Sequence, residues 1–488
     1  MKFKLLAPGI TGISLIFSVG NNAAMNVPQA SSFPNIILIQ VDQMRPDHLN
    51  KMPELMKLAN NGVLFEHAYT ASPLCQPSRV SLVTGLYPSQ TGIYGNQTGP
   101  VSDEQRDNTF MNKLRKAGYF TALIGKHHYI DRYSTGTDVV KEDADEIKRY
   151  GFDHLVQCLD VTEHIPNSDK TENLDDYTYF LKKKGLLEKY FSEVEEGMRS
   201  GKHPLSPDDS EDGFIGTQAA AFIINYNKKM PFYLNVSFIG PHPPYMVPGE
   251  PKTSPDNTAQ PLKAAPNANT SRRRAVYADM CSHIDSYIGK IVNVLKEKGY
   301  FENTLIIFVS DHGDNLGDYG IWDKRYFYEQ SVGVPLIISG KGVAGRDVRY
   351  GSIKSKALVS TLDIYPTILS GAGIDISDSD RPGINLMDII QDKPSAFRNA
   401  VFSELGTHSM IRTAKWKMVF DPEQDGVSYL YNLVSDPKEM NNLAGVSGYE
   451  AITAELTTQL LSRYITMVQS TQSKEQIRLQ SVRVKFRE

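Results

Sequence analysis

A segment near residue 75 carries residue types that suit chemistry on an oxyanion. Residues 75–85, CQPSRVSLVTG, place a cysteine, a proline and an arginine at the start of a short apolar run. Pro77 is tolerated in the first turn of a helix and Gly85 suits its end, so the segment predicts a short buried helix. Cys75 then lies just before a helix N-terminus, where free N–H groups and the helix dipole favour an anion. Arg79 adds a planar cation suited to sulfate or phosphate. A lone cysteine would more often be a packed loop residue, so the prediction depends on the whole segment.

Further candidate residues follow four apolar segments that are typical of buried strands, residues 35–41, 120–125, 232–240 and 304–310. The polar residues that follow these segments are Asp42 and Gln43, Lys126 and His128, His242, and Asp311 and His312. In open α/β sheets, ligands bind at the carboxyl ends of the strands, so the agreement of four segments predicts one site.

The residues after the first and last of these segments offer mostly oxygen donors. This hard donor set suits calcium or magnesium better than zinc. Aspartates at strand ends also often cap neighbouring backbone, and each pair by itself leaves that alternative open.

The elements that must position these side chains alternate between strand and helix. This alternation predicts a large, doubly wound, mainly parallel α/β sheet over residues 33–375, which includes a long amphipathic helix over residues 272–299. Residues 131–212 are polar without a sustained period and are interpreted as an insertion that helps shape the substrate pocket. After residue 375, short segments are expected to pair as antiparallel strands before a closing helix near residues 448–470. Residues 376–488 are therefore predicted to form a smaller α+β subdomain.

Composition limits the partners and the compartment. A net charge of −4 gives no overall electrostatic argument for nucleic acid, so any anionic ligand must meet a local cluster of cations. Residues 1–24 have two lysines and then an apolar run, as in a signal peptide, and no other stretch reaches membrane-spanning length. We therefore expect an exported, periplasmic or secreted protein. Three scattered cysteines exclude a disulfide framework, and Cys158 and Cys281 are left either paired or free.

The segment C-x-P-S-R-x-x-L-x-T-G resembles, residue for residue, the signature that type I sulfatases present to the enzyme that oxidises their cysteine to formylglycine. Four other segments resemble this family, GYFTALIGKHH at 118–128, PHPPY at 241–245, SDHG at 310–313 and LYNLVSDPKEMNNLA at 430–444. The resemblance runs from about residue 35 to 445. It implies an alkaline-phosphatase-like fold and a formylglycine-generating enzyme as a partner.

The resemblance also implies a metal site. Its ligands would be Asp42, Gln43, residue 75, Asp311 and His312, with calcium expected and magnesium as the alternative. Gln43 departs from the commoner second aspartate, and the same departure occurs in some sulfatases and in the related phosphonate monoester hydrolases.

The family mechanism assigns the groups that act on the ester. A hydrated formylglycine formed from Cys75 would attack sulfur while Arg79 and Lys126 hold the sulfate oxygens. His128 would then deprotonate the second hydroxyl, so that sulfate leaves and the aldehyde reforms.

The leaving alcohol needs a proton donor. His242, or Lys324 in WDKRYFYE at residues 322–329, would protonate it. His127 stands where the family usually has tryptophan and is expected to pack.

Three functions are compatible with these residues. The sequence favours a sulfatase that acts on a sulfated sugar or a small sulfate ester. A phosphonate monoester or phosphodiester hydrolase on the same scaffold is the alternative, which Gln43 encourages. An inactive carbohydrate-binding relative is the third, and the full set of candidate catalytic residues argues against it.

Overall fold

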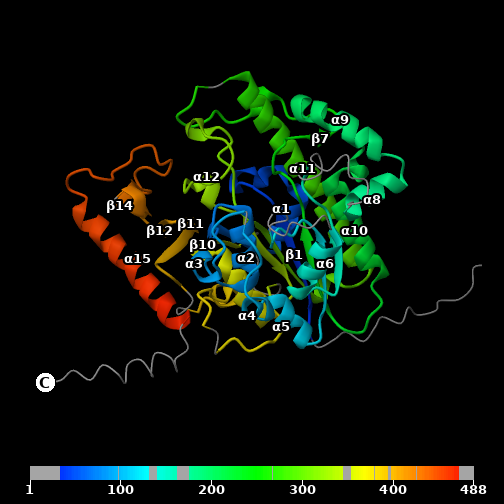
Figure 1. Cartoon of the computed structure of the whole chain (residues 1–488), viewed down its shortest axis with the longest axis horizontal. Helices are drawn as coiled ribbons and strands as arrows, with labels where there is room; N and C mark the ends of the chain where they lie inside the picture. Colours follow the sequence, from blue (N-terminus) through cyan, green and yellow to red (C-terminus); the bar gives the residue numbers. More distant parts are fainter. Residues whose placement is uncertain are drawn as a thin grey trace, which may run out of the picture.

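An eight-stranded sheet runs through the centre of the molecule (Figure 1). The computed structural model describes residues 33–471 except 97, 131–139, 162–174, 266, 344–352, 378–379, 394–396 and 425, so the predicted signal peptide at 1–24 lies outside the described residues. The strand order is β10-β2-β9-β8-β1-β6-β3-β4, and all neighbours are parallel except β9, which is antiparallel to β2 and β8. The strands are β1 (Asn35–Val41), β2 (Gly62–Tyr69), β3 (Phe120–Gly125), β4 (His154–Gln157), β6 (Phe232–Ser237), β8 (Thr304–Ser310), β9 (Leu336–Gly340) and β10 (Ile353–Ser360).

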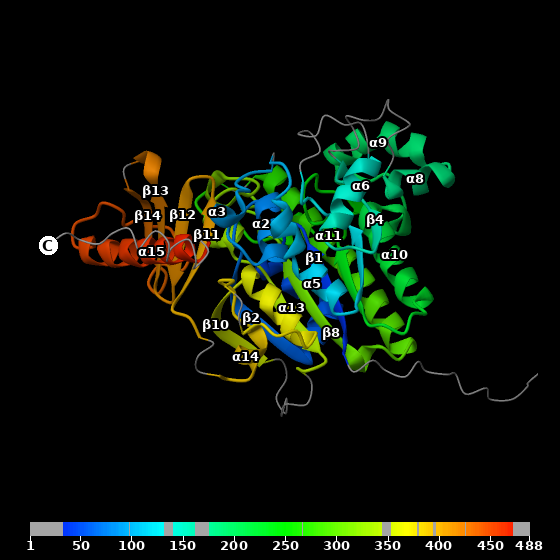
Figure 2. The same ribbon diagram turned by 60° about the horizontal axis from the view of Figure 1, so that its bottom comes forward.

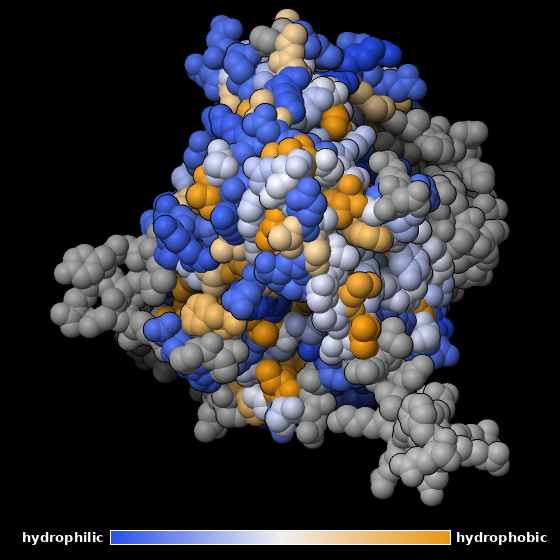
Figure 3. All heavy atoms as spheres, turned by 90° about the vertical axis from the view of Figure 1, so that its left-hand side faces the viewer, coloured by the Kyte–Doolittle hydropathy of each residue, from blue (hydrophilic) through white to orange (hydrophobic). Residues whose placement is uncertain are grey.

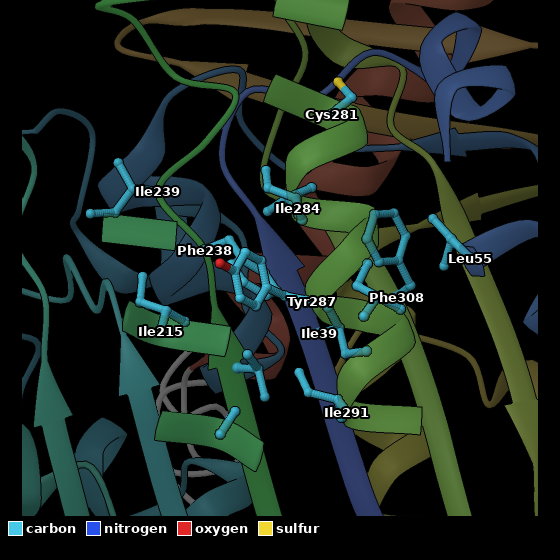
Figure 4. Close-up of a cluster of buried hydrophobic side chains, with 14 of the residues drawn as sticks. Ile39, Leu55, Ile215, Phe238, Ile239, Cys281, Ile284, Tyr287, Ile291 and Phe308 are labelled. Carbon is cyan, nitrogen blue, oxygen red and sulfur yellow. The ribbon is translucent and has the colours of Figure 1, made fainter. Parts of the chain in front are cut away.

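The central strands are buried on both faces, which explains their continuous apolar sequences. In β1, Ile37 and Ile39 point into one core, whereas Ile36 and Leu38 point into the other. Figure 4 shows the first core, where Ile284 and Ile291 of α11 (Ala268–Glu297) lie over Ile39.

Helices cover both faces of the sheet (Figure 2). One core includes residues of α1 (Pro53–Asn60), α10 (Glu211–Asn225) and α11, and the other includes residues of α2 (Cys75–Thr84), α5 (Phe110–Lys116), α13 (Ile364–Gly371) and α14 (Leu386–Ile390). The predicted doubly wound α/β fold is therefore confirmed. In the described part of the chain, no helix combines the length and apolarity needed to cross a membrane.

A second sheet follows the first. Its strands β11 (Ala400–Leu405), β12 (His408–Thr413), β13 (Trp416–Asp421) and β14 (Gly426–Asn432) are antiparallel and pair in chain order, and α15 (Glu450–Thr471) closes the unit. Met410 and Val419 pack towards the large sheet, whereas Ile411 and Met418 pack towards α15. On the side of the molecule shown in Figure 3, hydrophobic residues appear as separate spots among hydrophilic ones.

Residues 131–212 contain more regular structure than the sequence predicted. They include α6 (Val140–Arg149), edge strand β4, α8 (Asp176–Lys183) and α9 (Leu187–Ser200). The interpretation of this region as lacking a period was wrong. Each of the two later helices buries only three residues, such as Tyr177 and Leu181 in α8, and the charged residues on their other faces mask the pattern.

Short elements complete the fold, namely α3 (Pro88–Thr91), α4 (Asp103–Asp107), α12 (Glu329–Val332) and the small pair β5 (Lys202–His203) and β7 (Val247–Pro248). Cys158 and Cys281 are buried and free, which resolves the alternative left open above. Cys281 belongs to the core around α11 (Figure 4).

Candidate active site

Four adjacent parallel strands, β8, β1, β6 and β3, deliver the predicted polar residues to one edge of the sheet. Val41 of β1 is in register with Ser310 of β8, so Asp42 and Asp311 follow side by side. The structure thus brings together residues that lie more than 260 positions apart in the chain.

Cys75 is the first residue of α2, one position further into the helix than expected. All ten residues of this helix are buried, and it ends at Gly85, whose φ of 68° is left-handed. A Cβ on Gly85 would also lie 2.8 Å from the ring of Tyr365, so both backbone conformation and space require glycine there. The C-terminal end of the helix is therefore fixed, and Cys75 at its other end lies at the sheet edge.

Four buried side chains converge around the cysteine. Single ligand atoms of Asp42, Cys75, Asp311 and His312 all lie within 4.8 Å of one another. The Cys75 Sγ is 3.2 Å from the His312 Nε2 and 3.7 Å from the Asp42 Oδ1. Two carboxylates and an imidazole directed at one point fit a divalent cation, because acceptors of like charge repel one another without one.

Gln43 lies at this cluster with a left-handed φ of 68°. Its Oε1 accepts a hydrogen bond from the Lys324 Nζ at 2.8 Å, and its Nε2 donates to Asp314 at 2.7 Å and to Asp323 at 2.8 Å. A positive φ in a residue other than glycine is strained and is typical of functional sites.

Arg79 joins the two aspartates of the cluster. Its Nε donates to the Asp311 Oδ2 at 2.8 Å, and its Nη2 donates to the Asp42 Oδ2 at 3.1 Å. Its Nη1 donates to the Ser237 hydroxyl at 2.9 Å. The guanidinium is buried and each of its nitrogens has a protein acceptor, so its geometry fixes the orientation of both carboxylates.

Lys126 and His242 are linked through Asp160. The Asp160 Oδ2 lies 3.3 Å from the Lys126 Nζ and 3.0 Å from the His242 Nδ1, and Lys126 also lies 2.9 Å from Asp42. Burial and Lys324 lower the pKa of His242, but Asp160 and Asp42 raise it, to about 10. His242 is therefore protonated at neutral pH.

Sequence reasoning missed Asp160. This residue follows β4, which pairs with β3 in register Gly125 to Gln157, so it reaches the same sheet edge as the other candidates. Recognition of residues 154–157 as a strand would have exposed the same strand-end signal.

Lys324 lies against the cysteine. Its Nζ is 3.0 Å from the Cys75 Sγ, and its side chain is buried. Burial by itself would raise the pKa of the Cys75 thiol, but the Lys324 ammonium and His312 lower it well below its usual value. Lys324, expected only from the family resemblance, is thus adjacent to the reacting residue.

The two histidines after β3 differ in their surroundings. His127 is buried, and its Nε2 lies 3.4 Å from the Gln157 amide and its ring near Tyr129, as expected for packing. His128 has a left-handed φ of 51°, and its Nδ1 has no hydrogen-bond partner among the described residues. Its side chain also forms a hydrogen bond that lowers the pKa of the Cys75 thiol, so His128 lies beside the reacting residue.

Comparison with known proteins agrees with this geometry. A family model described as sulfatase matches residues 34–374, and a model described as the C-terminal region of N-sulphoglucosamine sulphohydrolase matches residues 317–465. An arylsulfatase of Clostridium perfringens is 31% identical over 460 residues, which cover 86% of this chain and 91% of that protein. A choline-sulfatase of Rhizobium meliloti is 29% identical over 461 residues, which cover 84% and 82%.

Solved structures share the fold. The phosphonate monoester hydrolase of Agrobacterium radiobacter superposes with a TM-score of 0.73 at 23% identity and covers 89% of this chain and 96% of its own. A match at this level of identity supports only the shared fold. The activity is inferred from the residues of the site and from the sequence relatives. The family match over residues 34–374, together with the residues gathered around Cys75, shows that the chain belongs to the sulfatase family and is a hydrolase of sulfate esters.

Proposed function

We propose that the protein removes sulfate from a sulfated carbohydrate, using formylglycine formed from Cys75 and one divalent cation. The observation that carries this proposal is the convergence of Asp42, Asp311 and His312 on Cys75 within 4.8 Å. A carbohydrate is supported by the match of residues 317–465 to the C-terminal region of a family named for N-sulphoglucosamine. The predicted signal peptide supports export to the periplasm or the medium.

The donor set suits the metal. Asp42, Gln43, Asp311, His312 and the oxidised residue 75 would hold calcium, or magnesium in its place. When bound, the cation supplies positive charge that stabilises sulfate oxygens and lowers the pKa of a nearby hydroxyl.

Formylglycine requires a maturing enzyme that oxidises the thiol-bearing carbon of Cys75 to an aldehyde. Its hydrate would offer two hydroxyls: one would displace the alcohol from sulfur, and loss of the proton from the other would break the carbon–oxygen bond to sulfate and restore the aldehyde. The His128 side chain forms a hydrogen bond with Cys75, so we assign the removal of that second proton to His128.

The cations of the site divide into two groups. Lys126 and Lys324 are single ammonium groups near residue 75 and are suited to neutralise sulfate oxygens. Arg79 is bound to Asp42 and Asp311, so we assign it mainly to the positioning of these carboxylates.

His242 is the proton donor for the leaving alcohol in this proposal. Its Nδ1 lies 3.0 Å from Asp160 and 2.6 Å from the Pro243 carbonyl, which leaves the Nε2 to face the substrate. The raised pKa of His242, about 10, keeps that proton available at neutral pH.

Peptide mass spectrometry of the active enzyme tests the proposal. We expect the peptide that contains residue 75 to lack the cysteine sulfur. In assays of the same enzyme, we expect inorganic sulfate and alcohol to be released in equal amounts. A fully active enzyme with an unmodified Cys75 thiol would contradict the mechanism.

Gln43 favours a second candidate, a phosphonate monoester or phosphodiester hydrolase. A neutral amide in place of a carboxylate makes the site less negative, which assists a phosphodiester and a sulfate monoester alike because each carries one negative charge. The match to the sulfatase family over residues 34–374 favours sulfate, so we expect a clear preference for sulfate over phosphonate or phosphodiester esters of the same alcohol. Equal or reversed kcat/KM at matched pH and metal would establish the second candidate.

A further inference from the structure

A cavity of about 640 Å³ lies beside the active site, and His242 and Asp323 are part of its lining. The lining also includes Arg199 at the end of α9 and Arg272 and Arg273 in the first turns of α11. This volume is within the range of pockets that hold small-molecule ligands. Because His242 is also the proposed proton donor, the cavity is placed to hold the alcohol part of the ester.

The cavity is cationic in a chain whose net charge is −4. Arg274, the third of three consecutive arginines, is buried and donates to Asp318 at 2.7 Å and to the Leu316 carbonyl at 2.9 Å. In contrast, no carboxylate of the described residues lies within ion-pair distance of Arg272 or Arg273. Arg274 thus holds a loop in place, whereas Arg272 and Arg273 contribute uncompensated positive charge to the cavity.

The remaining contacts leave donors on these two arginines. Arg272 gives one N–H to the Arg199 carbonyl at 2.7 Å. The guanidinium of Arg273 lies 4.9 Å from the centroid of the Trp322 ring, a stacking contact that leaves its edge donors free. The Asp323 carboxylate already accepts the Gln43 Nε2 at 2.8 Å and lies 3.9 Å from the Lys324 Nζ, so it is engaged on the side of the active site.

Apolar surface faces the same space. Trp322, Pro243, Pro244 and Val276 line the cavity. The face of a sugar ring that bears C–H groups packs well against such surface, whereas its charged substituents need the arginines.

We infer that the cavity binds an alcohol part that carries a second oxyanion, a sulfate or a carboxylate, which Arg272 and Arg273 bind. The inference rests on the proposed function only for the position of the scissile sulfate at residue 75. An alcohol part with a quaternary ammonium group, as in a choline ester, meets like charge in this cavity and is disfavoured. We therefore expect kcat/KM to fall in the order anionic, neutral and cationic alcohol part.

A charge series of aryl sulfates tests the order in the mature enzyme. The three substrates carry a carboxylate, a carboxamide or a trimethylammonium group on the ring, and kcat/KM is measured for the wild type and for the double variant Arg272→Gln with Arg273→Gln. We expect the double variant to lose about 10- to 100-fold on the carboxylate substrate and less than about threefold on the carboxamide substrate. Arg115→Gln, on α5 and paired with Asp153 at 3.0 Å, is the matched control and should change none of the three.

Equal losses on all three substrates would assign the two arginines to structure and overturn the inference. An unchanged rate on the carboxylate substrate would also overturn it.

A binding measurement separates failure of this inference from failure of the proposed function. The chain has two tryptophans, so Trp416→Phe leaves Trp322 as the single tryptophan fluorophore. Glucosamine, N-acetylglucosamine, N-sulfoglucosamine and glucuronic acid are titrated against its fluorescence, and the last two distinguish a sulfate from a carboxylate. We expect the anionic sugars to bind at least about tenfold more tightly than glucosamine, with the difference lost in the double arginine variant. Charge-independent binding would contradict the inference even if the enzyme hydrolyses sulfate esters, whereas charge-dependent binding without hydrolysis would contradict the proposed function alone.

Discussion

Residues 324–329 contribute to two buried charge clusters that can be compared directly. At one end of this segment, Lys324 contacts Cys75 at 3.0 Å in the candidate active site. At the other end, Glu329 lies 2.6 Å from Lys417, which is fully buried in β13 and also lies 2.6 Å from Glu439. Both clusters contain buried ion pairs.

The two clusters differ in how their charges are matched. In the Lys417 cluster, one ammonium lies between two carboxylates and a backbone carbonyl, and Tyr69 donates to Glu329 at 3.0 Å. Opposite charges alternate there, so the network is closed. In the Cys75 cluster, four ligand atoms converge within 4.8 Å and the cations Arg79 and Lys126 stand on their outer side.

Burial of charge is therefore a poor indicator of function, and convergence of acceptors is a better one. A closed network satisfies its own charges and can serve structure. Acceptors that face one another across a small space require something between them, which marks a ligand site.

Cys75→Ala should have the largest effect. We expect loss of at least about three orders of magnitude in kcat, because no nucleophile remains, with little change in thermal stability. Initial rates and the melting temperature are the measurements, and Cys281→Ala is the control, since Cys281 packs in the core and should keep most of the activity. Substantial turnover by the Cys75→Ala variant would remove the active-site assignment.

Removal of the metal should come next. Chelation, or Asp311→Asn, should lower kcat by about 100-fold or more, because the convergent acceptors lose their cation. Elemental analysis should show one divalent ion per chain, and calcium or magnesium should restore the chelated enzyme. If the Asp311→Asn variant kept both the ion and the rate, the convergent acceptors of the Cys75 cluster would not be the metal site.

Asp160→Asn should have an intermediate effect, about tenfold on kcat at neutral pH. The Asp160 carboxylate raises the pKa of His242, so its removal should shift the alkaline limb of the pH–kcat profile to lower pH. An unshifted limb would show that another group donates the proton.

The same pKa has a consequence for stability. His242 has a pKa of about 10 in the folded protein against 6.5 for a free histidine side chain, so its protonation stabilises the fold fully below pH 6.5. This contribution is lost as pH rises through about 10. Urea unfolding of the wild type at pH 6.5 and at pH 10 should show a larger difference than in Asp160→Asn.

Lys417→Met should leave turnover nearly unchanged. Removal of the ammonium leaves Glu329 and Glu439 buried together, so we expect a loss of about 3–5 kcal/mol in the free energy of unfolding. Urea denaturation measures the loss, and the rate per folded molecule should stay within about twofold. A large loss of turnover at full stability would place Lys417 in the catalytic machinery and end the contrast between the clusters.

The sequence alone predicts the class of fold and most of the residues that gather at the edge of the sheet. The apolar segments at 35–41, 120–125, 232–240 and 304–310 became the four central strands because strands buried on both faces must be continuously apolar. The polar residues that follow them were identified from the same signal. The segment at 75–85 also specified its helix, because Pro77 and Gly85 act locally.

The tertiary structure determines which partners each of these side chains contacts. The strand order and register bring Asp160 to Lys126 and His242, and the loop after β8 brings Lys324 to residue 75. No local pattern encodes pairing between segments that are far apart in the chain. The partners of Arg79, and the separation of Arg274 from Arg272 and Arg273, depend on which acceptors lie within reach after folding. The sequence specifies which donors and acceptors exist, and the packed structure determines which of them remain free for a substrate.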